Sequence, residues 1–180
     1  NYSLTVSGST TGQTVTGTII VNPVISSNLS SALFNAPSYL TFDSSGNLFI
    51  ADGDFKQLIR KITPQGVVST YAGSTSGQYG ITNGNLSNAT FHGLDDMVFD
   101  SNGNMFLRER GNTPAIRKIT LQGVVTTFAG PEQTQQYGLV NGNGTNARFG
   151  GGGVSGGLAI DGNNNLYTPD YANHVIRKIT

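Results

Sequence analysis

The sequence predicts an all-β chain assembled from three copies of one four-stranded unit. The pentapeptide Ile-Arg-Lys-Ile-Thr occurs three times. The isoleucines at its fourth position, Ile62, Ile119 and Ile179, are 57 and 60 residues apart. Before each copy come an aspartate, a turn rich in Gly and Asn, and an apolar strand. A phrase that recurs at a nearly fixed spacing indicates a repeat architecture in which each copy is one supersecondary unit.

The first repeat contains four short runs with strong β propensity, separated by tight turns. The turns contain Ser44-Ser45-Gly46-Asn47 and Pro64-Gln65-Gly66, and Gly and Asn tolerate the positive φ that hairpin turns require. Four short strands joined by hairpins are typical of one propeller blade. The expected strands are residues 39–43, 48–52, 58–63 and 67–72.

The second and third repeats follow the same plan, and the third is one strand short. The expected strands are residues 97–100, 105–107, 115–120 and 124–129, then 158–161, 166–168 and 175–180. We therefore expect three blades, at about residues 28–73, 85–130 and 143–180, within a domain of residues 23–180. Three blades are too few to close a ring, since propellers have about four blades or more.

Residues 1–22 are expected to form an N-terminal β extension, for which two interpretations stand. The segment is either the tail of an upstream immunoglobulin-like domain or a strand that belongs to the propeller. Residues 15–21, with Val15, Ile19 and Val21, are rich in β-branched residues. An open blade edge invites a partner strand, so we predict that this stretch completes the third blade of a neighbouring molecule, giving a ring or a filament. The competing explanation is that the 180 residues are part of a longer chain that supplies the strand.

The repeated phrase resembles the motif of the NHL repeat family of β-propellers, in its exported bacterial form. The third copy carries the likeness most clearly, in Asp170-Tyr171-Ala172-Asn173-His174-Val175-Ile176-Arg177-Lys178-Ile179. Residues 108–114 and 53–56 depart from the motif, so the loops of the first two repeats are expected to differ. The resemblance covers residues 28–180 and implies a propeller that recognises other molecules.

Three sets of repeated residues are expected to have structural roles. Phe34, Phe91 and Phe149 each lead into a blade and are predicted to be buried anchors. Asp43, Asp100 and Asp161 end the first strand and are expected to accept backbone N–H groups in the turn, a role we prefer to calcium binding. Arg60, Arg117 and Arg177 are expected to pack between blades and to bond a carbonyl or a carboxylate, with Asp52, Glu109 and Asp170 as partners.

The residues that carry most enzyme chemistry are sparse. The chain has no cysteine, and its two histidines, His92 and His174, lie in different repeats, whereas zinc needs three or four ligands close together. Gly153-Val154-Ser155-Gly156-Gly157 lies in a predicted loop, which is the wrong context for a nucleophile elbow. We therefore predict a protein that is not an enzyme and has no catalytic residue, metal or cofactor.

Charge and composition also limit the partners. Lys+Arg and Asp+Glu are 10 each, which argues against a nucleic-acid surface with clustered cations. No run approaches the ~20 apolar residues of a membrane span, so membrane insertion is not expected. The absence of cysteine and the low charged fraction of 11% fit an extracellular or cell-surface protein.

The long polar linkers between repeats, residues 73–90 and 130–148, are the expected contact surface. They suggest a non-catalytic module that recognises protein or glycan. The alternative is a structural subunit of an extracellular filament or oligomer, and a propeller enzyme is a distant third. Sequons at Asn28, Asn85, Asn88 and Asn143 are possible glycosylation sites if the source is a eukaryote.

Overall fold

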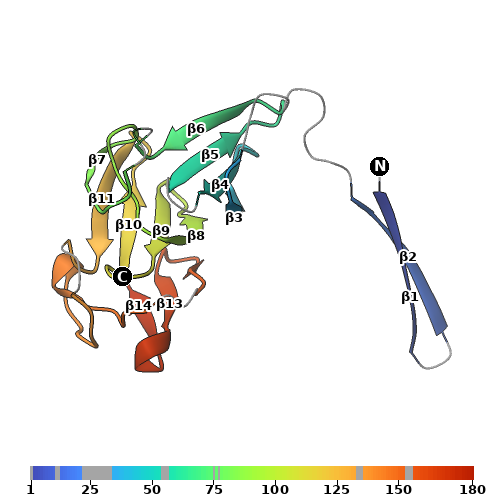
Figure 1. Ribbon diagram of the computed structural model, residues 1–180. Coiled ribbons are helices and arrows are strands. Elements are labelled where there is room, and N and C mark those ends of the chain that lie inside the picture. Colours follow the sequence, from blue (N-terminus) through green and yellow to red (C-terminus); the bar gives the residue numbers. More distant parts are fainter. Residues whose placement is uncertain are drawn as a thin grey trace.

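The computed structural model describes residues 34–53, 57–74, 76, 78–132, 136–152 and 156–180 with their side chains, and the backbone of residues 2–10 and 13–21 (Figure 1). The fold is all-β, as predicted, and its strands form antiparallel sheets. Three of these sheets follow one another along the chain, and each contains one copy of the repeat.

The first sheet has the strand order β3-β4-β5-β6. Its strands are β3 (Pro37–Phe42), β4 (Leu48–Asp52), β5 (Leu58–Ile62) and β6 (Val68–Ala72). The second sheet has the order β7-β11-β10-β9-β8, with β7 (Gly84–Asn85), β8 (Leu94–Phe99), β9 (Met105–Glu109), β10 (Ala115–Ile119) and β11 (Val124–Ala129). The third has the order β12-β13-β14, with β12 (Ala159–Ile160), β13 (Leu166–Asp170) and β14 (Val175–Ile179).

The first two sheets also share a shift of register at the same position of the repeat. The β5–β6 register shifts between Ile59 and Arg60, and the β10–β11 register shifts between Ile116 and Arg117. Such shifts bend a strand and increase its twist. The recurrent Ile-Arg pair therefore marks the same bend in the first two sheets.

The three sheets pack against one another like successive blades of a propeller. Strand β8 contacts both β3 and β12, so the first strands of the sheets meet on one side. One hydrophobic layer includes Phe49, Met97 and Leu107, and a second includes Phe106 and Leu158. The part of the chain that the structure describes forms an open arc of blades and does not close into a ring.

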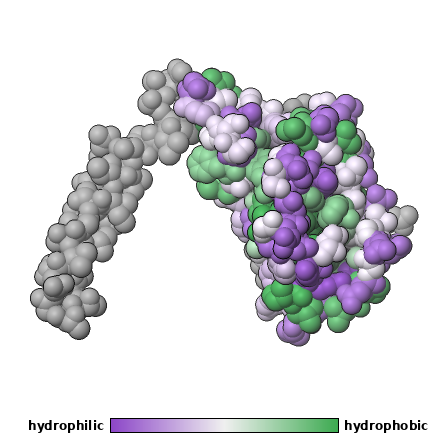
Figure 2. Space-filling model, turned by 180° about the vertical axis from the view of Figure 1, so that it is seen from behind, coloured by the Kyte–Doolittle hydropathy of each residue, from purple (hydrophilic) through white to green (hydrophobic). Residues whose placement is uncertain are grey.

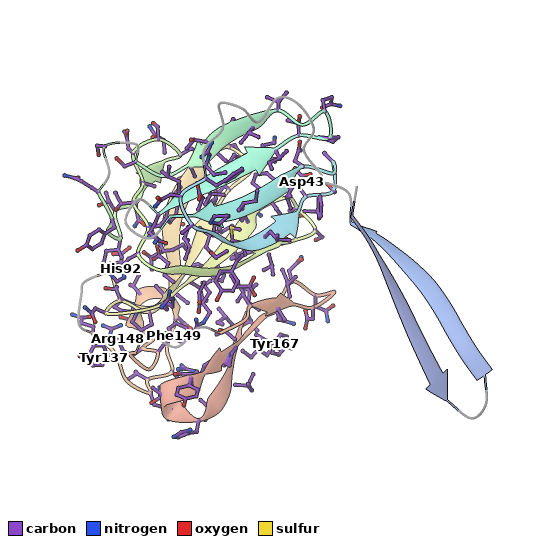
Figure 3. The ribbon with its side chains drawn as sticks, turned by 45° about the vertical axis from the view of Figure 1, so that its right-hand side comes forward. Asp43, His92, Tyr137, Arg148, Phe149 and Tyr167 are labelled. Atoms are coloured by element: carbon purple, nitrogen blue, oxygen red, sulfur yellow. The ribbon has the colours of Figure 1, made fainter. Side chains whose placement is uncertain are left out.

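The blades have two distinct ends. The turn of each repeat that contains Asp43, Asp100 or Asp161 lies at one end, which we call the turn face. The linkers and the loops that follow β4 and β9 lie at the other end, which we call the linker face. Figure 3 shows Asp43 on the opposite side of the blades from His92 and Tyr137.

Two features of the linkers differ from the loops that the sequence predicted. The first linker contributes β7, a short fifth strand that pairs with β11 through Asn85 and Val124. The second linker contains a single 3-10 turn, η2 (Gly144–Asn146). Polar linkers can pair in this way because the outer edge of a blade offers backbone groups that need partners.

The outer edge of β14 has no paired strand among the residues described. A cavity of about 450 Å³ lies beside it, lined by β14 and by Asn141–Gly144 of the linker. Ile176 on β14 is 69% exposed, whereas its equivalents Ile59 and Ile116 are 0% and 1% exposed.

Hydrophobic patches lie among polar areas on the surface (Figure 2).

The N-terminal segment forms a hairpin. β1 (Tyr2–Thr10) pairs with β2 (Gln13–Val21) over its whole length, from Tyr2 opposite Val21 to Thr10 opposite Gln13. Val15, Ile19 and Val21 are thus all in the ladder with β1, and these two strands form a sheet of their own. Addition of β2 to another molecule remains a prediction.

Candidate ligand-binding pocket

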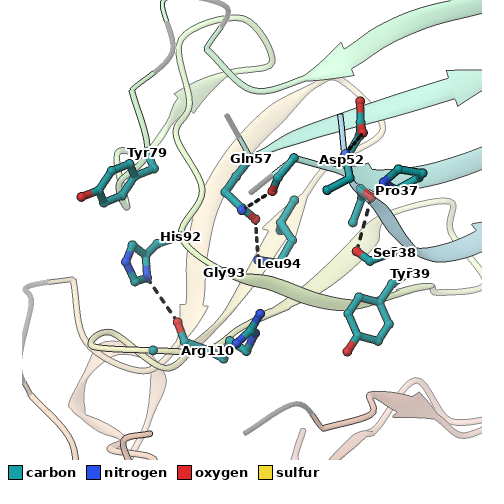
Figure 4. A pocket seen from close by; sticks show the side chains of 14 residues that line it. Pro37, Ser38, Tyr39, Asp52, Gln57, Tyr79, His92, Gly93, Leu94 and Arg110 are labelled. Carbon is teal, nitrogen blue, oxygen red and sulfur yellow. Dashed lines mark hydrogen bonds between the residues drawn. The ribbon is translucent and has the colours of Figure 1, made fainter. Parts of the chain in front are cut away.

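A cavity of about 570 Å³ opens between the first and second blades at the linker face (Figure 4). The start of β3, the end of β4 and the start of β8 form its walls, together with Tyr79 of the first linker and the loop at Arg110 and Gly111. A concave site with a few polar groups directed into it is the usual form of a small-ligand site. The five segments come from two repeats, so the packing of the two blades creates the cavity.

Aromatic side chains stand at the two ends of this pocket. Tyr79 and His92 lie together at one end, with ring centroids 5.5 Å apart, and Tyr39 stands at the other (Figure 4). Tyr79 is 62% exposed. A tyrosine offers an apolar ring face and a polar tip, which suits contact with a ligand that is both apolar and hydrated.

Hydrogen bonds hold the polar side chains of the wall in place. Gln57 accepts a hydrogen bond from the Leu94 backbone N–H at 2.9 Å and donates to the Gly53 carbonyl oxygen. His92 Nδ1 lies 3.2 Å from the Arg110 carbonyl oxygen. Because a carbonyl only accepts, Nδ1 is the donor, and Nε2 is the acceptor nitrogen in the neutral ring.

Both charged groups that line the pocket have ionic partners within the protein. Asp52 pairs with Arg60 at 3.3 Å, and its other oxygen accepts the backbone N–H of Asn35 at 2.8 Å. Arg110 Nε lies 3.5 Å from Asp95 Oδ1. Asp95 is fully buried between Arg110 and Arg108.

Differences between repeats explain why the cavity lies at the first junction. Arg108 occupies in the second blade the position of Ala51 in the first. It pairs with Asp95 and reaches across to Thr168 of the third blade, where Nε donates to Oγ1 at 3.0 Å. The cavity at that second junction measures only about 10 Å³. The small side chain of Ala51 leaves the first junction open.

Differences in and next to the linkers also leave the first junction more open than the second. His92, which follows Phe91, corresponds to Gly150, which follows Phe149, and Tyr79 of the first linker corresponds to Tyr137 of the second. Tyr137 lies directly on Gly151, where an added Cβ would be 2.8 Å from its ring. Tyr79 instead packs beside His92, so its ring stands at the pocket.

The repeated arginines and acids together clamp the linker at the phenylalanine. Arg117 donates to the Thr90 carbonyl oxygen at 3.2 Å and pairs with Glu109 at 3.1 Å. Glu109 accepts the His92 backbone N–H at 2.9 Å. The residues before and after Phe91 are thereby fixed. Arg177 and Asp170 make the same contacts with Arg148 and Gly150, at 2.8 Å each, and Arg177 pairs with Asp170 at 3.0 Å.

The phenylalanines lie under these arginines. Phe91 and Phe149 are buried and Phe34 is half-buried. The guanidinium carbons of Arg117, Arg177 and Arg60 lie 5.6, 4.9 and 5.2 Å from the respective ring centroids, within the distance for a cation–π interaction. The three rings thus occupy the same place in each repeat but are not equally buried.

The aspartates of the turn face share one hydrogen-bond pattern. Asp43 Oδ1 accepts the backbone N–H groups of Ser45 at 2.9 Å and Asn47 at 2.8 Å, and Asp100 and Asp161 accept from the equivalent residues. The Asn165 side chain and backbone are the main cause of the low pKa of Asp161, about 2. Burial acts to raise the pKa of Asp43, but the hydrogen bonds from Asn47 and Ser45 outweigh it and lower the pKa.

The remaining candidates lie apart from the pocket. Asn85, Asn88 and Asn143 are exposed on the linkers, and Asn28 lies outside the described residues. His174 has a positive φ of 56° and its ring faces Tyr171. Across the residues described, no group of three or more His, Cys, Asp or Glu side chains could hold a metal ion. No helix there is long and apolar enough to span a membrane.

Apart from Asp52, the residues that line the pocket were not predicted as a site from the sequence. Several of them, such as Ala51, Gln57 and His92, differ between the repeats. His92 lies in a loop and has no partner close to it in the sequence, and Tyr39, Tyr79 and Gln57 belong to no recognisable motif. The available signal was the set of positions at which aligned repeats differ, such as Ala51 against Arg108. Repeat identity predicts the scaffold, whereas repeat differences point to the site.

Comparison with known proteins supports the fold. No protein-family model and no curated protein matches the sequence. A structure of a Bacteroides thetaiotaomicron protein of unknown function matches with a TM-score of 0.65 and 23% identity, over 93% of this chain and 39% of the other. An auxiliary nutrient binding protein from Bacteroides ovatus matches with a TM-score of 0.64 and 22% identity, over 78% of this chain and 36% of the other.

A virginiamycin B lyase from Staphylococcus aureus matches less well, with a TM-score of 0.45 and 16% identity, over 83% of this chain and 54% of the other. At these identities the first two likenesses establish the propeller-like fold alone. The chain spans less than two-fifths of the length of the two Bacteroides proteins. Membership of the NHL repeat family remains a prediction from the sequence.

Proposed function

We propose that this protein is a non-catalytic recognition module of an extracellular or cell-surface protein, and that it binds protein or glycan at the linker face. The observation that carries the proposal is the pocket of about 570 Å³ between the first two blades, with tyrosines at both ends. The side chains of His92, Gln57 and Asp52 bond backbone groups around it, and Arg110 pairs with Asp95. Such a wall is suited to holding a ligand in a fixed orientation.

Two further considerations support binding. Tyr79, Arg110 and Gly111 line the pocket from loops at the linker face, and loops on a rigid scaffold are the usual place for recognition. The similar structure from Bacteroides ovatus is a nutrient binding protein. We extend that role to this chain only as part of the proposal, together with the NHL-type repeat and its exported location.

The proposal is tested with an array that presents oligosaccharides and short peptides to the purified chain. The wild type is compared with Tyr79→Ala and with Tyr137→Ala, the matched control at the equivalent exposed position of the second linker. We expect probes that bind the wild type and Tyr137→Ala but lose binding to Tyr79→Ala. Ala51→Arg, which introduces the side chain found at the second junction, should also abolish binding. Binding that is absent, or equal in all variants, would contradict the proposal.

A second candidate function is a structural subunit that assembles head to tail. Among the residues described, the outer edge of β14 has no paired strand and Ile176 is exposed. These features favour assembly, because an open edge accepts strands. The strand with Val15, Ile19 and Val21 is the proposed donor. Since β2 pairs with β1 through one edge, its other edge would have to make the contact. A heterologous contact of this kind closes into a ring or continues as a filament.

A further inference from the structure

We infer that the pocket between the first two blades binds an uncharged oligosaccharide, an inference that rests on the proposed function and specifies its ligand. Three features carry it: the aromatic ends of the pocket, the paired state of its charged groups and the glycines at its rim.

The aromatic ends favour a ligand with flat apolar faces. Tyr79 and Tyr39 stand at opposite ends of the cavity, and Tyr79 presents much of its ring to solvent. A pyranose ring has C–H faces that pack against an aromatic ring and hydroxyl groups that point outward to the polar wall. Tyrosine supplies such contact area at a low cost in conformational entropy. A ligand that touches both tyrosines must span the pocket, which favours several sugar rings over one.

The charges favour an uncharged ligand. An anionic ligand would have to compete with buried Asp95 for Arg110, and a cationic ligand would have to compete with Arg60 for Asp52. Breaking the Arg60–Asp52 pair would separate two largely buried charges, which is costly. An anion at Arg110 would also lie close to the buried carboxylate of Asp95, which repels it. Hydroxyl groups need no counter-ion, and His92 offers them Nε2 as an acceptor in the neutral ring.

Three of the residues that line the pocket are glycines with a positive φ. Gly53, Gly93 and Gly111 line the pocket, and their φ angles are 124°, 67° and 94°, which disfavour any other residue. A Cβ on Gly111 would lie 2.8 Å from the His92 ring, and one on Gly93 would lie 3.0 Å from the Arg110 side chain. A side chain at either position would therefore disturb the wall that holds the ligand.

The size of the cavity agrees with this ligand. Small-molecule sites measure about 300–1,000 Å³, and this one lies within that range at about 570 Å³. The pocket itself is therefore assigned to a short chain of sugars.

The test is titration calorimetry with three sets of probes on the wild-type chain. The sets are uncharged trisaccharides of gluco, galacto and manno configuration, the corresponding uronic acid trimers, and uncharged tripeptides. We expect at least one uncharged trisaccharide to bind. Tyr79→Ala should weaken that binding by about tenfold or more, since an aromatic contact and its buried area are lost. Tyr79→Phe should retain it, because the ring remains, and Tyr137→Ala should leave it unchanged.

Each outcome decides the inference. If uronic acids or peptides bind in a Tyr79-dependent way and uncharged sugars do not, the inference is overturned while recognition at this pocket stands. If no uncharged trisaccharide binds up to about 10 mM, the inference is again overturned, and the array separately decides the proposed function. Far-ultraviolet circular dichroism of the variants confirms that each is folded.

Discussion

At the scale of single residues, the chain is held together by a clamp that recurs in each repeat. An acidic side chain at the end of the second strand receives a backbone N–H beside the phenylalanine, and an arginine of the third strand covers its ring. The second repeat is the variant case, because Glu109 stands where the others have aspartate. Burial raises the pKa of Glu109 to about 7, against the opposing attraction of Arg117.

This raised pKa predicts a stability that depends on pH. In the unfolded chain Glu109 loses its proton near its ordinary pKa of 4.5, whereas in the folded chain it keeps the proton up to about pH 7. Its contribution to stability is therefore present below pH 4.5 and is lost as the pH rises to 7. We expect urea denaturation to show a decline across this window, with a slope of at most about 1.4 kcal/mol per pH unit.

Two matched variants distinguish the contribution of Glu109 to this pH dependence from that of the other carboxyl groups. Glu109→Gln should flatten the decline, whereas Glu132→Gln, which alters an exposed carboxyl of the second linker, should preserve it. Identical pH profiles for the wild type and Glu109→Gln would show that the pKa of Glu109 is not raised.

The phenylalanines provide a second prediction at this scale. Phe91 is fully buried, so Phe91→Ala should reduce the free energy of unfolding by about 3–5 kcal/mol, through lost burial and a cavity. Phe34→Ala should cost less, because Phe34 is only half-buried. Chemical denaturation of both variants gives the comparison. Equal losses would contradict the difference in burial between the first two repeats.

At the scale of elements, most strands could be predicted from the sequence and most of the linkers could not. The pentapeptide and the Asp-Gly-Asn turns locate β4, β5, β9 and β10 because local propensity and turn chemistry agree there. Strand β8 begins at Leu94, before the predicted 97–100, because the acidic residues Asp95 and Asp96 obscure a strand whose polar groups bond the third blade. Strand β7 escaped prediction because its pairing with β11 is a tertiary contact without a local signal.

The turn of the third repeat offers a direct prediction. Asp161 accepts hydrogen bonds from the side chain and the backbone of Asn165 at 2.8 and 2.9 Å, and these are the main cause of its pKa of about 2. Asn165→Ala should raise that pKa towards 3.8, because the side-chain donor to the charged form is lost. Carboxyl-carbon NMR titration measures both values, with Asn146→Ala as a control on a distant linker. A wild-type pKa near 3.8 would contradict the turn geometry.

At the scale of the whole molecule, the repeats build an arc of blades, and the differences between repeats create the pocket. Fold class and repeat boundaries followed from periodicity, which reports what the copies share. The pocket required the structure, because it depends on which side chains of two blades face each other. Ala51 and Arg108 are one example, since they differ in size and occupy the same position at an open junction and at a filled one.

Assembly through the N-terminal strand is a prediction at this same scale. If the edge of β2 adds to β14 of a neighbour, the intact chain should exceed the monomer mass in light scattering, and removal of residues 1–22 should return it to the monomer. Strand β14, with Arg177 and Lys178, is present in the intact and in the shortened chain, so the deletion removes only the strand that is proposed to be donated. An intact chain that is monomeric, or an assembly that survives the deletion, would end this hypothesis.

The central claim is that ligand binds between the first two blades at the linker face, and amide chemical-shift mapping tests it most directly. Uncharged trisaccharides of gluco, galacto and manno configuration are titrated into isotope-labelled protein. The account predicts that the backbone amides of Gly53, Gly93 and Gly111, which line the pocket, shift with saturation, while those of Gly46 and Gly103 in the turns of the opposite face do not move. Shifts concentrated at Gly46 and Gly103, or none at the pocket glycines, would contradict it.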